Sequence, residues 1–324
     1  MWEEPDEIAH CYMVPSMTNT LYKQLESYKI AKVILDKLED MFRGQAMLAQ
    51  QSAITTLMNA QQKARHFGQR PYVNYTTLCF APYGDHWRNL RRLSTIDIFS
   101  STRLNMSLDI HRDEVSHLLR RLYQVFADGF AKVELKSLFS ELTFNIIMRM
   151  MVGKQYFDDE ATQNSDEGRR FQEMIKELFE LAVSSYPGDF LPILQLVDYN
   201  GYIKRIKDLA SITDELTQGM IDEHRSNKGD LNIKNTMITH LLSMQESQPE
   251  YCTEEIIKGL IQVILNAGTD TTAITLERAM SNLLNNPHVL EKARAELDKL
   301  VDQEKLVEEA DVAKLPYLQR AMTT

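Results

Sequence analysis

Cysteine and positive charge are both scarce in this sequence. Only three cysteines occur in 324 residues, at Cys11, Cys79 and Cys252, and their wide spacing fits neither a disulfide framework nor a zinc site. Lys and Arg number 36 against 46 Asp and Glu, which leaves a formal net charge of −10 and a pI near 5.4. This balance argues against a protein that binds nucleic acid non-specifically through its charge.

Long apolar runs are missing as well. No stretch approaches the roughly 20 residues that span a bilayer, and the N-terminus does not resemble a signal peptide. We therefore expect a chain without a membrane anchor, cytoplasmic or peripheral in location. A hydrophobic content of 44% is nevertheless ample for a core, and the length suits one large domain or two.

The stretch Glu254–Asn285 predicts one helix of about 30 residues. Thr253 can cap its start, and Pro287 opens the next element. Apolar residues recur along the stretch at helical spacing, and they are nearly continuous around residues 263–265. We therefore expect a long helix that is buried on most sides in that turn.

The middle of this helix, Ala267-Gly-Thr-Asp-Thr-Thr272, is poor helix sequence. Gly costs about 1 kcal/mol relative to Ala in a helix, and Asp and Thr compete for backbone hydrogen bonds. One interpretation is a helix kink or a satisfied polar core. The other is a ligand that lies against the helix at Gly268, with Asp270 and Thr271 facing it.

A second motif is Phe80-Ala-Pro-Tyr-Gly-Asp-His-Trp-Arg-Asn-Leu-Arg-Arg92. Asp85 can cap a helix that places Trp87 and Arg91 four residues apart on one face. At this spacing the guanidinium and the indole can form a cation–π pair or simply pack together. Arg88 is turned about 100° from Trp87, so we expect it to face solvent or neighbouring acids.

Together the two motifs resemble those of cytochrome P-450, the haem-thiolate monooxygenases, whose distal helix carries Ala/Gly-Gly-x-Asp/Glu-Thr-Thr/Ser. The resemblance runs from about residue 65 to Gln319. In this family the distal segment activates oxygen, which implies that Asp270 and Thr271 are catalytic and that Ala267 and Gly268 contact the cofactor.

The same resemblance assigns Trp87 and Arg91 to the cofactor, because the family's Trp-x-x-x-Arg pair donates hydrogen bonds to a haem propionate. It implies a haem cofactor, electrons from NADPH through a separate cytochrome P-450 reductase, and O₂-dependent hydroxylation of a small lipophilic plant metabolite. The family resides at the endoplasmic reticulum membrane. The segment Asp189-Phe-Leu-Pro192 resembles sequences of plant enzymes of the A-type clan, near the isoflavone-hydroxylase group.

The fold is expected to be mainly α. The resemblance predicts a partial cytochrome P-450 fold over residues 65–324, preceded by a helical segment over residues 1–64. Two amphipathic helices in that segment, Met17–Phe42 and Gln45–Ala64, resemble the gag protein of copia-type plant retrotransposons, which implies self-association. An unrelated helical hairpin is the alternative. No Cys/His knuckle is present to bind RNA. Periodicity predicts further helices over residues 107–126, 136–151, 166–183, 202–225 and 287–301.

Two features of the family do not occur in this sequence. One is the Phe-x-x-Gly-x-Arg-x-Cys-x-Gly loop that supplies the axial thiolate, so no residue is assigned as a metal ligand. The other is the Glu-x-x-Arg motif that follows the text at Leu315–Gln319 in the family. Glu291-Lys-Ala-Arg294 has the right spacing but precedes that text, and we interpret it as an exposed i,i+3 pair.

A haem iron without its thiolate is neither held nor activated in the family's way. We therefore expect this chain by itself to be inactive, and its long helix to lack packing partners that stabilise it. The function implied by resemblance is that of a monooxygenase. The alternative is a non-catalytic chimeric or pseudogene product that self-associates through the gag-like segment.

Overall fold

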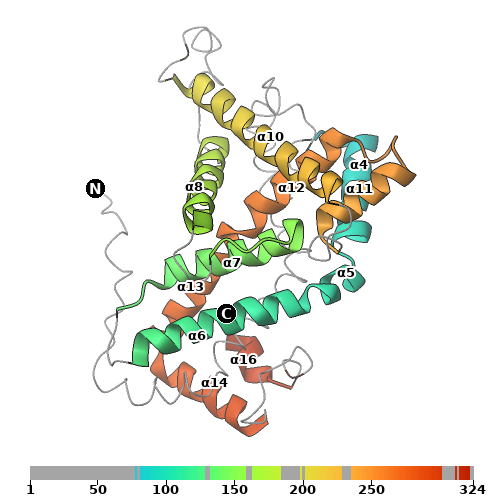
Figure 1. The fold of residues 1–324 in the computed structure, drawn as a ribbon. Coiled ribbons are helices and arrows are strands. Elements are labelled where there is room, and N and C mark those ends of the chain that lie inside the picture. The colour runs from blue at the N-terminus through green and yellow to red at the C-terminus, as the bar shows by residue number, and fades with distance from the viewer. Residues whose placement is uncertain are drawn as a thin grey trace. The chain divides into compact units, whose positions relative to one another are not determined.

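The computed structural model describes residues 77–78, 81–127, 132–157, 163–183, 198, 201–227, 235–300, 311 and 314–321 (Figure 1). Over these residues the regular structure is helical and includes no strand, which confirms the mainly α prediction. The predicted gag-like segment lies outside the described residues and stays a prediction. The elements are α4 (Asp85–Arg92), the π-helix η1 (Leu93–Ile98), α5 (Ser101–Met106), α6 (Leu108–Ala127), α7 (Leu135–Val152), α8 (Gln163–Val183), α10 (Tyr202–Ser226), α11 (Met237–Ser247), α12 (Glu254–Gly268), α13 (Asp270–Asn285), α14 (Pro287–Leu300) and α16 (Pro316–Ala321).

The helices group into two compact units, which we describe separately. Among the described residues, the first unit contains His111–Thr143 and the residues from Thr271 onward, and the second contains the residues up to Ile110 together with Phe144–Asp270. None of the helices described here is both long and apolar enough to cross a bilayer.

The long distal helix is the one element whose predicted extent is wrong. The structure has two helices, α12 and α13, with Thr269 between them. The Thr269 hydroxyl donates to the carbonyl of Leu265 at 2.9 Å, a local bond that competes with continued helix. The predicted cap is confirmed, because the Thr253 side chain accepts from the backbone N–H of Ile256.

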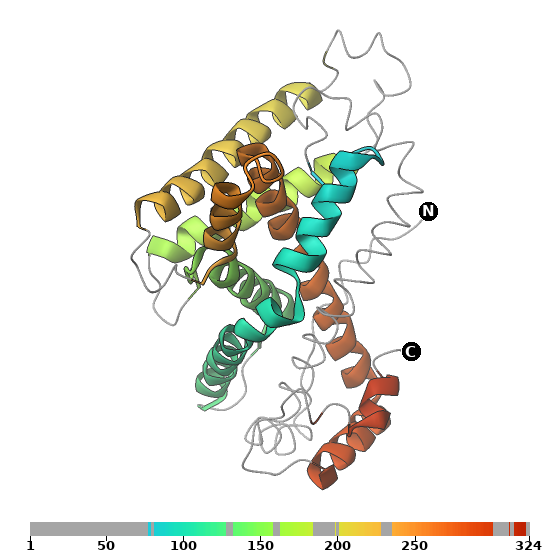
Figure 2. The same cartoon turned by 90° about the vertical axis from the view of Figure 1, so that its right-hand side faces the viewer.

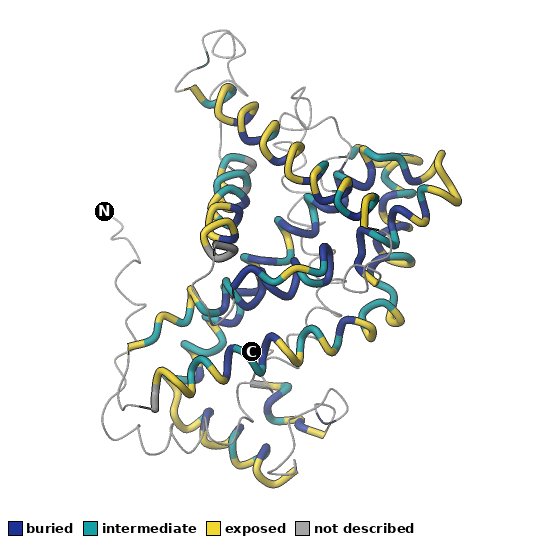
Figure 3. Tube along the Cα trace, in the orientation of Figure 1, coloured by how far each residue is buried: buried dark blue, intermediate teal, exposed yellow. Residues whose placement is uncertain are grey.

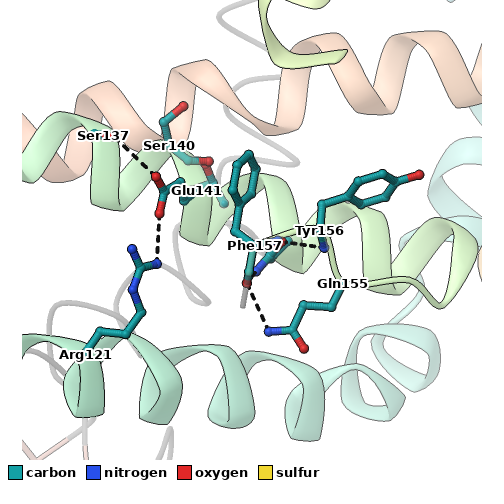
Figure 4. Close-up of polar contacts among 9 residues, drawn as sticks. Arg121, Ser137, Ser140, Glu141, Gln155, Tyr156 and Phe157 are labelled. Carbon is teal, nitrogen blue, oxygen red and sulfur yellow. Dashed lines mark hydrogen bonds and ion pairs between the residues drawn. The ribbon is translucent and has the colours of Figure 1, made fainter. Parts of the chain in front are cut away.

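In the first unit, polar contacts join helices that are distant in sequence. Arg121 of α6 donates to Glu141 of α7 at 2.8 Å, and Ser137 donates to the same carboxylate at 3.4 Å (Figure 4). Glu296 of α14 accepts from the backbone N–H groups of Tyr317 and Leu318 at 2.8 and 2.9 Å. A carboxylate on these unpaired N–H groups anchors the short helix α16 to α14.

The predicted pair between Glu291 and Arg294 is wrong. Arg294 instead lies 3.5 Å from Asp298, four residues further along α14. Both spacings bring side chains onto one helix face, so the sequence pattern could not choose between them.

The second unit has its core around the C-terminal half of α7, which is buried along nearly its whole length (Figure 3). Phe144 is fully buried there and makes edge-on contacts with three other rings. The centroid distances are 5.7 Å to Tyr156, 5.8 Å to Phe157 and 5.7 Å to Phe171. Such T-shaped pairs add to the burial of the rings themselves, so this cluster fixes α8 and the turn after α7.

Asn145, the next residue of α7, fastens the same turn through its side chain. Its amide donates to the carbonyl of Phe157 at 2.6 Å, and its carbonyl accepts from the N–H groups of Tyr156 and Phe157 at 3.1 and 3.0 Å. Gln155 adds a bond to the Phe157 carbonyl at 3.2 Å (Figure 4). The buried amide of Asn145 supplies hydrogen-bond partners to three backbone groups of the turn. It thereby avoids the free-energy cost of leaving those groups buried and unpaired.

The helices α10, α11 and α12 pack together in the second unit (Figure 2). Lys258 of α12 lies 2.9 Å from Asp214 of α10, and Arg225 of α10 lies 2.6 Å from Glu254 of α12. Arg225 also donates to Gln245 of α11 at 3.1 Å. The hydrogen bond from Arg225 lowers the pKa of Glu254. These pairs are partly exposed, so they orient the helices relative to one another more than they stabilise the fold.

His224 is buried in α10 as the neutral imidazole. It is only 2% exposed, its Nδ1 lies 2.7 Å from the carbonyl of Met220, and its Nε2 is buried without a partner. Burial lowers the pKa of His224 below its ordinary value of 6.5. The folded state therefore binds a proton less readily than the unfolded state. The stability contributed by neutral His224 is complete above pH 6.5 and is lost as the pH falls below that value.

We predict that the free energy of unfolding falls between about pH 7.5 and pH 5.5, and that His224→Gln reduces this dependence. Urea unfolding at the two pH values measures it, with His288→Gln as the control because His288 is exposed. An unchanged pH dependence in His224→Gln would contradict the assignment.

Candidate functional site

Helix α4 carries the predicted carboxylate-binding pair. The guanidinium carbon of Arg91 lies 5.6 Å from the ring centroid of Trp87, so the two side chains do share a face of α4. Arg91 is exposed, whereas Trp87 is half-buried. The guanidinium N–H groups and the indole N–H could together bind a carboxylate, and the observed stacking is also the cation–π pair that the spacing allows.

Asp85 does not cap α4 as predicted. The N-cap residue of α4 is Gly84, which has no side chain to accept a hydrogen bond. Asp85 lies in the first turn, and its carboxylate accepts a hydrogen bond from Arg88 at 2.7 Å. This bond raises the pKa of Arg88. The Arg88 guanidinium also lies 5.5 Å from the ring of Tyr83, which in turn lies 5.4 Å from the Trp87 ring. Arg88 is therefore engaged by Asp85 and Tyr83, whereas Arg91 contacts Trp87.

The distal motif presents different residues on different faces. Ala267 and Thr271, four residues apart, are exposed, and Asp270 is half-buried. Thr269 and Thr272 are buried, at 4% and 7% exposed. The expectation that Thr271 and Thr272 point in different directions agrees with this pattern.

Gly268 has a neighbour in the protein on the side where a side chain would project. A Cβ placed on Gly268 would lie 2.8 Å from Cδ1 and 3.2 Å from Cγ1 of Ile147. Helix α12 ends at Gly268, which agrees with the interpretation that this motif interrupts the helix. The assignment of Gly268 to the cofactor stays a prediction.

Cys252 is not suited to bind iron as a thiolate. Its side chain is fully buried, and the thiol donates to the carbonyl of Leu241 at 3.6 Å. Burial and then the charge of Asp97 raise the pKa of Cys252 to about 11, so the thiol stays protonated at neutral pH. Cys11 and Cys79 lie outside the described residues. In the part of the chain that the structure describes, no three His, Cys, Asp or Glu side chains gather as a metal site.

The donor set fits one part of a haem site. Trp87 and Arg91 supply the donors that a propionate requires, and Arg91 is exposed and able to meet it. On the distal segment, Ala267 is an exposed apolar residue that suits an apolar ligand. The α4 pair and Ala267–Asp270 belong to the second unit, whereas Thr271 belongs to the first.

Sequence reasoning missed three residues that bear on these motifs. Tyr83 contacts Trp87, but inside its motif it carried no assigned role. Ile147 was part of an apolar stripe that indicated only a core position. Ile274 belongs to the apolar residues at helical spacing in Glu254–Asn285, and its exposure is set by tertiary structure.

The chain resembles solved structures in its fold. It matches a zebrafish cytochrome P450 structure with abiraterone, with a TM-score of 0.58, 18% identity, and 76% of this chain and 53% of that chain covered. A second zebrafish structure, with progesterone, gives a TM-score of 0.59 at 21% identity over 81% of this chain and 60% of that chain. At these identities the likeness concerns the fold, and it defines the class as the cytochrome P450 fold.

The chain belongs to the cytochrome P450 family, whose sequence model matches residues 31–323. It is 49% identical over 257 residues to Cytochrome P450 81E8 of Medicago truncatula, covering 78% of this chain and 51% of that relative. It is 47% identical over 261 residues to an isoflavone 3'-hydroxylase of the same plant, covering 79% of this chain and 52% of that relative. The predicted kinship with plant enzymes near the isoflavone hydroxylases is confirmed.

The chain spans about half the length of the curated relatives it matches. The family match begins at residue 31, inside the segment 1–64 for which a separate gag-like domain was predicted. The boundary at residue 65 stays a prediction.

We predict that Arg91→Ala loosens haem retention more than Arg88→Ala. The variants are made in a fusion of this chain to the C-terminal half of Cytochrome P450 81E8. Loss of a charge-assisted bond to a carboxylate costs about 1.5–3 kcal/mol, or roughly tenfold or more in retention. Arg88 is the matched control, since it is already paired with Asp85. Transfer of haem to apomyoglobin measures the rate, and equal loss from both variants would contradict the assignment.

Proposed function

We propose that this chain forms the distal half of a haem-thiolate monooxygenase that hydroxylates a small lipophilic plant metabolite with O₂. The observation that carries the proposal is the broken distal helix. Around the break, Ala267 and Thr271 are each exposed, and Asp270 is half-buried. A hydroxyl and a carboxyl at a gap in a helix suit proton delivery to a bound substrate or cofactor.

The cofactor and electron source follow from the family. Haem, when bound, supplies the oxygen chemistry, and the protein supplies binding and protons. We propose that electrons come from NADPH through a separate reductase at the endoplasmic reticulum membrane. Relatives named for isoflavone hydroxylation support a substrate of that size and polarity, without fixing which one.

The α4 pair would hold the cofactor by its edge. Trp87 and Arg91 would donate to a propionate, and the Tyr83 ring contacts Trp87 in a tilted arrangement with the centroids 5.4 Å apart. Arg91 lies 5.6 Å from the Trp87 ring centroid, and this cation–π contact reduces the side-chain freedom that Arg91 would lose on binding a carboxylate.

The chain by itself is predicted not to form the thiolate-ligated centre. The buried, protonated Cys252 cannot supply the ligand, and neither Cys11 nor Cys79 lies in the family's loop sequence. We predict that the purified 324-residue chain, supplied with haemin and reduced under CO, lacks the absorption band of a ferrous–CO thiolate complex. The fusion to the C-terminal half of Cytochrome P450 81E8 should show it.

A stoichiometric thiolate band from the chain alone would overturn this prediction. Absence of the band in a folded fusion would count against the proposed monooxygenase. In that case the non-catalytic alternative would stand, and size-exclusion chromatography of the chain would test its self-association.

The proposed chemistry of this chain's own residues is proton delivery. The Thr271 hydroxyl can hold a proton at the exposed side of the distal segment, and the Asp270 carboxyl beside it can replace that proton from solvent. Thr272 is buried on another face and cannot take this role.

We predict that Thr271→Ala in the fusion leaves haem content nearly unchanged and diverts reducing equivalents to peroxide. General acid–base steps contribute about 10²–10⁴ in rate, so product per NADPH should fall steeply. Thr272→Ala is the matched control and should change coupling far less. Product and peroxide are both measured per NADPH consumed. Unchanged coupling in Thr271→Ala would leave that hydroxyl with only a structural role.

A further inference from the structure

Gly268 stands at the last position of α12, and its backbone does not require glycine. The described glycines with positive φ are Gly153 and Gly201, and Gly268 is not among them. Any residue could therefore adopt its backbone conformation. The reason for glycine must lie in the space around it.

That space is filled by Ile147 of α7. A Cβ on Gly268 would lie 2.8 Å from Ile147 Cδ1, closer than real Cβ atoms approach other atoms. Gly219 in the interior of α10 is a useful contrast, because a Cβ there would meet nothing within 4 Å. The missing side chain at Gly268 thus lets α7 and α12 approach each other at this point.

Ile147 is poorly able to move out of the way. It is 5% exposed, and its neighbours in α7, Met148 and Met151, are fully buried. Its β-branched side chain has one strongly preferred χ1 rotamer in a helix, which fixes Cγ1 at 3.2 Å from the added Cβ, and the close-packed surroundings restrict the movement of Cδ1. The contact is therefore a fixed stop for the last turn of α12.

We propose that Ile147 is a positioning residue for the distal motif. By occupying the notch at Gly268 it sets the rotation of the last turn of α12. Ala267, about 100° away around the helix, is thereby turned to the exposed side. The importance of this orientation for oxygen chemistry rests on the proposed function, whereas the contact itself does not.

A simple alternative is that Gly268 is present only because glycine weakens the helix before Thr269. In that case the identity of residue 147 would not matter to a substitution at 268. A steric stop predicts the opposite: removing Cδ1 from Ile147 should relieve the effect of adding a Cβ at Gly268.

The experiment compares four variants of the full 324-residue chain. They are Gly268→Ala, the control Gly219→Ala, and Gly268→Ala combined with either Ile147→Val or Ile146→Val. Ile146 is also buried in α7 and does not contact Gly268 in this way, so it is the matched control for loss of one methylene. Thermal unfolding reports stability, and hydrogen exchange with mass spectrometry reports the segment 265–272.

We expect Gly268→Ala to lower Tm by about 2–6 °C and to speed exchange in segment 265–272 about tenfold, with little change in α10. Ile147→Val should restore both, and Ile146→Val should not. Gly219→Ala should leave Tm unchanged or raise it.

The proposal is overturned if Gly268→Ala is as harmless as Gly219→Ala, or if both valine substitutions restore it equally. If Gly268→Ala is insoluble, recovery of soluble protein with Ile147→Val supports the contact, and loss of both variants overturns it. These measurements involve no haem. A fusion that fails to bind haem would therefore overturn the proposed function while the contact remains testable.

Discussion

Burial of the C-terminal half of α7 is the constraint on which the second unit depends. A helix that is apolar around its whole circumference must be covered on every side. Phe144 meets three rings, Asn145 fastens the following turn, and Ile147 meets Gly268. One helical segment thereby determines the positions of α8, the turn after α7 and the end of α12. A polar residue in such a helix is tolerated because Asn145 satisfies backbone groups that would otherwise be unpaired.

The contact between α7 and α12 links core packing to the chemistry proposed for the distal motif. In this motif a close-packed position and an exposed position are neighbours in sequence, Gly268 and Ala267. Tight packing on one side fixes the helix, and the exposed side is then held without needing side-chain contacts of its own. The ion pairs of Lys258 and Arg225 at the other end of α12 are partly exposed. They therefore help to orient α10 and α12 more than they stabilise the fold.

The α4 pair works on a different physical basis. Arg91 and Trp87 are held by their mutual stacking, and Arg88 is drawn to Asp85 and Tyr83. Such exposed contacts contribute little to stability, but together they separate the two arginines into different surroundings. The proposed binding of a haem propionate by this pair therefore needs only donors that are already in place.

The sequence by itself determined the helical class, the limits of α6, α7, α8, α10 and α14 to within three residues, the cap at Thr253 and the family, because periodicity, capping and short motifs are local signals. It did not determine the break at Thr269 or the partner of Arg294. Local patterns allowed several outcomes there, and packing chose one. The neighbour of Gly268 was equally hidden, since Ile147 is 121 residues away in sequence and looks like any other core isoleucine. Only tertiary structure brings two such residues together, and it does so because the buried half of α7 must be covered.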